Sequence, residues 1–87
     1  MKYLTVFTIR PEHQKAARER FLKGDVQFPG LKLIGRWFET GTGHGITIFD
    51  ADDPVALTKY GLYWNDLIDM RAFPLIDDSQ MLAALKQ

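Results

Sequence analysis

The chain of 87 residues contains no cysteine and only two histidines, and its 11 basic and 11 acidic side chains give a formal net charge of zero. The absence of cysteine excludes disulfides and thiolate metal ligands. His13 and His44 stand far apart in the sequence, which is not the spacing of a structural metal site. We therefore expect neither a metal nor a cofactor.

The sequence also has no run of basic residues and no apolar run as long as a membrane span. A nucleic-acid partner and a membrane location are therefore not expected. The first residues, Met1 to Ile9, contain Thr5 and Thr8 within their apolar stretch and end before Arg10. This pattern favours a strand over a signal peptide, and we expect a cytoplasmic protein.

Hydrophobic residues make up 46% of the chain and aromatic residues 13%, which is typical of a folded domain. We expect one domain covering residues 1–87. At this size, hydrophobic burial and conformational entropy nearly cancel, and small domains often need disulfides, a metal or a partner subunit. With the first two excluded by composition, association with a second copy is the remaining source of stability.

The segment Leu31–Glu39 carries large apolar side chains at both odd and even positions, for example Leu33 and Trp37 against Ile34 and Phe38. A strand with one face in water alternates between apolar and polar residues. This strand is therefore predicted to be covered on both faces.

Turn and capping residues divide the rest of the chain. Pro11 and Pro54 suit the first turn of a helix, Asp53 suits an N-cap, and Gly24 suits a helix end. Three glycines at alternate positions in 40–45 allow positive φ in a hairpin loop. The predicted elements are strand Lys2–Ile9, a helix from Pro11 to about Lys23, loop 25–30, strand Leu31–Glu39, strand Ile46–Ala51, a helix from Pro54 to about Leu67, strand Asp69–Ile76 and a short helix capped by Asp77-Asp78-Ser79.

This order, β-α-β-β-α-β with a short C-terminal helix, predicts an α+β, ferredoxin-like domain with a four-stranded antiparallel sheet. The second and fourth strands are expected at the edges, with the helices on one face. The other face is apolar and needs a cover. A second copy related by a two-fold axis is the simplest one, so we expect a homodimer.

Several short motifs resemble a bacterial family of short chains of unknown function within the dimeric α/β-barrel superfamily. They are Thr8-Ile9-Arg10-Pro11-Glu12, Gly35-Arg36-Trp37, Asp52-Asp53-Pro54, Trp64 with Asp66-Leu67-Ile68-Asp69, and Phe73-Pro74-Leu75-Ile76-Asp77-Asp78. The resemblance implies a homodimeric α/β barrel with a ligand pocket between sheet and helices. Where members of the family often have histidine after Gly-Arg-Trp, this chain has Phe38, which removes any inherited acid–base role there.

Candidate ligand-binding residues are Phe7, Arg36, Trp37, Tyr60 and Trp64. Their rings could line a pocket for a flat small molecule, and Arg36 could hold a carboxylate. The alternatives are that the aromatic residues form an ordinary core and that Arg36 belongs to an ion pair with Asp69 or Glu39.

Arg36 and His44 are the candidate catalytic residues. His44 is a candidate acid or base because imidazole titrates near neutrality, and Arg36 is a candidate because it could hold a carboxylate of the substrate. A surface histidine in a loop is the competing interpretation for His44. Three functions stay open: a homodimer that binds a small apolar or aromatic molecule, a cofactor-independent isomerase, cyclase or monooxygenase acting on an aromatic or polyketide-like substrate, and a purely structural dimer.

Overall fold

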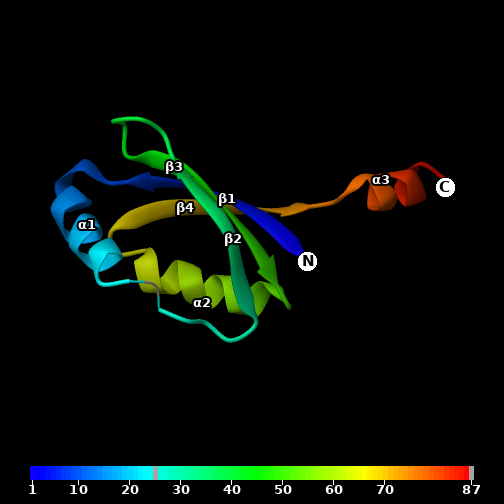
Figure 1. Ribbon diagram of the computed structural model, residues 1–87, viewed down its shortest axis with the longest axis horizontal. Helices are drawn as coiled ribbons and strands as arrows, with labels where there is room; N and C mark the ends of the chain where they lie inside the picture. The colour runs from blue at the N-terminus through cyan, green and yellow to red at the C-terminus, as the bar shows by residue number, and fades with distance from the viewer. Residues whose placement is uncertain (25, 87) are drawn as a thin grey trace.

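A computed structural model describes residues 1–24 and 26–86 (Figure 1). The predicted strand β1 (Lys2–Ile9) is confirmed with the same bounds. The other elements are the 3-10 turn η1 (Pro11–His13), α1 (Gln14–Leu22), β2 (Leu31–Phe38), β3 (His44–Ala51), α2 (Pro54–Trp64), β4 (Ile68–Leu75) and α3 (Asp78–Leu85). Asp25, the first residue of the predicted loop 25–30, lies outside the described residues.

The four strands form one antiparallel sheet in the order β2-β3-β1-β4. This confirms the ferredoxin-like α+β fold, with the second and fourth strands at the edges. Helices α1 and α2 lie on the same face of the sheet (Figure 1). Among the described residues, no helix has the length and apolar character needed to cross a membrane.

The helix starts follow the local chemistry. The carboxylate of Asp53 accepts a hydrogen bond from the Ala56 amide, and Pro54 occupies the first turn of α2. Asp77 and Gln80 form a reciprocal capping box at α3, which satisfies amides that a helix start otherwise leaves unpaired. Gly24 has a φ of 94° just after α1. Helix α2 ends three residues before the predicted Leu67, because residues 65–67 form the corner that leads into β4.

The core lies between the sheet and α2. Its largest members are aromatic and come from both layers, and they pack as a single cluster. The buried aromatic residues are Tyr3, Phe7, Phe49, Tyr60 and Trp64. Helix α1 contributes little to this cluster, because Ala17 is its one buried residue among those described.

The edge strand β2 contains an irregularity that changes which side chains face the helices. Its register with β3 shifts between Leu33 and Gly35, so Ile34 is an extra residue. An extra residue reverses the alternation of side chains beyond it. Leu33 is therefore on the helix side of the sheet, and so is Arg36 three residues later.

The loop between β2 and β3 uses two of its three glycines as the sequence predicts. Gly41 and Gly43 have positive φ, of 73° and 78°. Gly45 does not, and the prediction of positive φ is wrong there. Gly45 lies within β3, and a Cβ on it would collide with the Phe7 ring and stand 2.6 Å from the Trp37 carbonyl oxygen. This glycine is required for close packing rather than for a turn.

The C-terminal arm, defined here as residues 76–86, extends away from the rest of the chain (Figure 1). All residues of α3 are exposed. The radius of gyration is 14.6 Å, against roughly 12 Å for a compact chain of this length. The arm is therefore the part of the structure that the body of the same chain does not cover.

Substitutions at two glycines should have opposite effects on stability. Gly45→Ala forces a methyl group against Phe7 and the Trp37 backbone and is expected to lower the free energy of unfolding by about 1–3 kcal/mol. Gly61→Ala, in α2 with open space around it, should raise that free energy by about 0.5–1 kcal/mol. Urea denaturation measures both, and equal changes in the two variants would contradict the packing role of Gly45.

Candidate functional site

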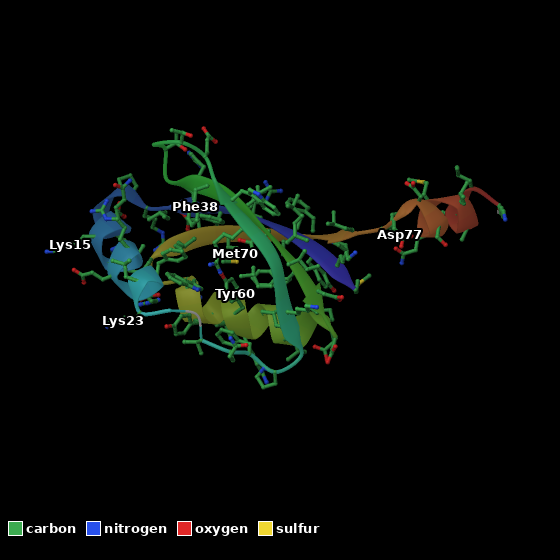
Figure 2. The ribbon with its side chains drawn as sticks, viewed as in Figure 1. Lys15, Lys23, Phe38, Tyr60, Met70 and Asp77 are labelled. Carbon is green, nitrogen blue, oxygen red and sulfur yellow. The ribbon has the colours of Figure 1, made fainter. Side chains whose placement is uncertain are left out.

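A cavity of about 260 Å³ lies between the sheet and the two helices. Its lining is apolar except for two guanidinium groups and one phenol. The sheet contributes Phe7, Ile9, Arg36, Phe38, Ile68 and Met70, helix α1 contributes Ala17, Arg18, Phe21 and Leu22, and helix α2 contributes Tyr60 and Trp64. Figure 2 shows Phe38, Met70 and Tyr60 within this region.

Edge-to-face contacts between aromatic rings build the wall near β2. The ring of Phe38 stands 5.7 Å from that of Phe7 and also 5.7 Å from that of Phe21, both at steep angles. This geometry is favourable for aromatic pairs. Phe38 thus connects the sheet with α1, although its side chain remains about half exposed, at 53%. It forms part of an accessible rim rather than a sealed wall.

The polar groups of the lining come from three elements. The Arg36 guanidinium donates a hydrogen bond of 3.3 Å to the Tyr60 hydroxyl and lies 5.5 Å from the centre of the Phe21 ring. Arg18 borders the same cavity from α1. No carboxylate borders the cavity among the described residues. The site therefore has the space for an apolar molecule and has hydrogen-bond donors in its lining.

Helix α1, the outer wall of the cavity, is held to α2 by Arg20. Its guanidinium donates to both carboxylate oxygens of Asp66, at 2.9 and 2.8 Å, and to the Tyr63 carbonyl at 2.8 Å. The same group lies 5.2 Å from the ring centres of Tyr63 and Trp64. A two-pronged pair of this kind fixes orientation as well as distance. The Asp66 pKa is lowered, chiefly by the hydrogen bond from Arg20.

A second arginine fixes the corner between α2 and β4. Arg10 donates twice to one oxygen of Asp69, at 3.1 and 2.9 Å, and to the carbonyls of Asn65 and Asp66, both at 3.0 Å. The hydrogen bond lowers the Asp69 pKa and raises the Arg10 pKa. Of the two acidic partners considered for Arg36, Asp69 and Glu39, Asp69 pairs with Arg10 instead.

Four of the five predicted ligand-binding residues border the cavity: Phe7, Arg36, Tyr60 and Trp64. Trp37 does not. Neighbouring residues of a strand face opposite sides, so Trp37 points to the open face of the sheet, where its ring covers Gly35 and 53% of its surface is exposed. Phe38 occupies the cavity side in its place.

The two candidate catalytic residues are not brought together. His44 begins β3 on the open face, where its Nδ1 stands 2.9 Å from the Thr8 hydroxyl. Arg36 faces the helices on the other side of the sheet. One bound molecule in the cavity would meet Arg36 and not His44.

Sequence reasoning missed several residues of the lining, among them Phe38, Met70 and Phe21. Phe21 belongs to the apolar side of its helix, and that stripe was the available signal. For Phe38 no local signal existed, because its facing depends on the extra residue at Ile34. In the described part of the chain, no group of three or more histidine, aspartate or glutamate side chains is placed to hold a metal ion.

Comparison with protein families gives a match along the whole chain. The model for a domain of unknown function, DUF3303, matches residues 1–87. The chain belongs to the DUF3303 family. This confirms the resemblance to a family of unknown function, while no curated protein matches the sequence. This DUF3303 chain is also similar to a solved structure titled "Structure of Rv0793 from Mycobacterium tuberculosis", with 12% identity and a TM-score of 0.44 over 88% of this chain and 95% of that one.

The two aspartates should make the stability of this DUF3303 protein sensitive to acid. A carboxyl group whose pKa is lower in the folded state stabilises the fold above its unfolded pKa, here near the ordinary value of 3.8, and loses that contribution as the pH falls through the folded pKa. The urea midpoint is expected to fall as the pH is lowered below about 4.

Asp66→Asn should show a shallower fall of the urea midpoint than the parent protein. Asp52→Asn, at an exposed aspartate outside these pairs, is the matched control and should keep the parent slope. An Asp66→Asn profile parallel to that of the parent would show that the Arg20 pair does not contribute to stability.

Proposed function

We propose that this DUF3303 protein is a homodimer that binds a small apolar or aromatic molecule in the cavity between the sheet and the two helices. The observation that carries the proposal is the cavity of about 260 Å³ with an almost wholly apolar lining. Apolar cavities of about 150 Å³ hold benzene. The larger volume here suits a larger molecule, of about two or three aromatic rings.

The distribution of polar groups supports binding over a structural role. A purely structural dimer has no need of an open space beside its core, since protein interiors are normally close-packed. The Arg36 guanidinium and the Tyr60 hydroxyl lie side by side in a lining that is otherwise apolar except for Arg18. Few polar groups within an apolar pocket are the usual arrangement for orienting a small ligand.

The placement of Arg36 and His44 also favours binding over catalysis. An isomerase, cyclase or monooxygenase using both residues on one substrate would need them on the same face of the sheet. They lie on opposite faces, with His44 beside Thr8 and Arg36 beside Tyr60. Binding is the function that the geometry supports best.

The open face of the sheet supports the dimer. Its apolar residues include Trp37, Ile46 and Phe73, which are 53%, 39% and 38% exposed. A contiguous apolar patch of this kind marks an interaction surface. Arg71 lies over the Phe73 ring, 5.1 Å from its centre, beside this patch.

Filling the cavity should abolish binding. Ala17 is 3% exposed and borders the cavity, so Ala17→Leu places three more carbon atoms in the space. In a Trp37→Phe background, Trp64 is the sole tryptophan and its emission reports the cavity. Titration with the neutral aromatic probe N-phenyl-1-naphthylamine should show saturable quenching of Trp64, weakened at least about tenfold by Ala17→Leu, since a filled site excludes the ligand.

Ala16→Leu is the matched control, because Ala16 is the exposed neighbour on the same helix. It should bind the probe as the parent does, and urea curves establish that both variants fold. Equal binding by Ala16→Leu and Ala17→Leu, or no quenching in the parent, would refute the cavity as the site.

The dimer has its own test in sedimentation at micromolar concentration. The expected species has twice the mass of the 10.0 kDa chain. Ile46→Lys, at the centre of the open face, should shift the population to monomer, because it buries a charge in the interface. Val55→Lys, on the exposed side of α2 and 60% exposed before substitution, should leave the dimer intact. A parent protein that sediments as a monomer would contradict the dimer.

A further inference from the structure

We infer that the C-terminal arm of each chain docks on the cavity rim of a second copy, so that the binding site of one subunit is completed by helix α3 of the other. The cavity rim is defined here as Phe21, Leu22 and Phe38. This inference rests on the proposed homodimer and cavity, and it adds which segment crosses between the subunits and where that segment binds.

Helix α3 requires a partner for its own stability. It has 8 residues, and isolated helices shorter than about 12–15 residues are marginal in water. Met81, Leu82 and Leu85 share one side at helical spacing and are 48%, 58% and 73% exposed. The capping box at Asp77 fixes where the helix begins, but it leaves this apolar side uncovered.

The exposed area matches what a stable dimer buries. A compact chain of this mass exposes roughly 5,200 Å², whereas this chain exposes 6288 Å². The excess, about 1,000 Å², is comparable with the roughly 800 Å² that each partner contributes to a standard interface. The extended arm and the open sheet face together supply enough surface for a second copy.

The cavity rim is an apolar surface of matching character. Phe21, Leu22 and Phe38 are 46%, 81% and 53% exposed, and all three line the cavity. Three large side chains on α3 and three on the rim would each leave water on contact. Burial of this area is the main source of free energy in such an association.

Charge also favours the rim as the binding position. Asp77 and Asp78 begin the arm's helix, and Arg18 and Lys23 flank Leu22 on or next to α1. Figure 2 shows Lys15 and Lys23 at the α1 end and Asp77 in the arm. The α1 end is mainly basic, although Glu19 also lies on that helix, whereas the open sheet face has Asp69 near Arg71 and is closer to balance.

The arm cannot reach the rim of its own chain. Helices α1 and α3 lie at opposite ends of the long axis (Figure 1), which measures 49 Å. Strand β4 runs between them, with Ile68 beside Ile9 and Leu75 beside Lys2. A two-fold axis across the strands reverses the long axis and brings each arm to the rim of the other chain. Such a pairing is reciprocal and closed.

Crosslinking between two differently tagged chains tests this placement. Because the chain has no native cysteine, only the introduced cysteines can react. One chain carries Leu85→Cys and the other Leu22→Cys, and the mixed dimers are treated with a short bis-maleimide. The expected product joins the two tags. Leu85→Cys mixed with Val55→Cys is the matched control and should give little product, because Val55 lies on α2 outside the rim.

Charge reversal gives an independent measurement. Asp78→Arg and Arg18→Asp should each weaken dimerisation about two- to fivefold, the range for an exposed ion pair, and the doubly substituted chain should regain the loss. Asp78 is chosen because Asp77, and not Asp78, forms the cap.

The outcomes separate this inference from the proposed function. A stable dimer in which Leu85→Cys joins Ile46→Cys or Val55→Cys at least as readily as Leu22→Cys overturns the arm placement and leaves the dimer and cavity standing. A double charge variant weaker than either single variant also counts against the arm placement. A monomer in sedimentation overturns the proposed dimer and this inference together.

Discussion

The pairing of Arg20 with Asp66 is the polar contact that ties α1, the outer wall of the cavity, to the end of α2. Helix α1 buries only Ala17 among its described residues, so packing alone does little to fix its position. The guanidinium of Arg20 sets the spacing instead, by binding a carboxylate and a carbonyl at the end of α2 while stacking near Tyr63 and Trp64. A helix that is held by such polar contacts does not need to pack closely on the sheet, so the space between them can remain open.

This arrangement leaves an open space beside the core at the expense of close packing. The aromatic cluster below α2 is dense, with Phe49 and Tyr60 at 4.7 Å, and it gives the sheet a rigid base. The region below α1 is looser and is bordered by the half-exposed Phe38. Sites with precise geometry usually stand on rigid elements, and here the sheet and α2 supply the rigid side while α1 supplies the outer wall.

The parts of the fold that depend on local chemistry could be predicted from the sequence. Asp53, Pro54 and Asp77 mark helix starts through backbone contacts that lie within three residues, so a single sequence contains the whole signal. The order of strands follows from the order of elements. The facing of Trp37 and Phe38 depends instead on a register shift at Ile34 against a strand that lies elsewhere in the sequence. The pairing of Asp69 with Arg10 rather than Arg36 likewise depends on contacts between residues that are distant in the sequence.

The irregularity in β2 also bears on how the sheet avoids uncontrolled polymerisation. An edge strand offers unpaired N–H and C=O groups to any chain in extended conformation. The shift at Ile34 breaks the straight run of such groups on one edge, and Pro74 has no N–H to offer on the other. Fibre growth by strand addition is therefore discouraged at both edges, although the strands are long and rich in apolar residues. The exposed apolar side chains of the sheet, such as Ile46, lie on its open face, which offers side chains rather than free backbone groups to another chain.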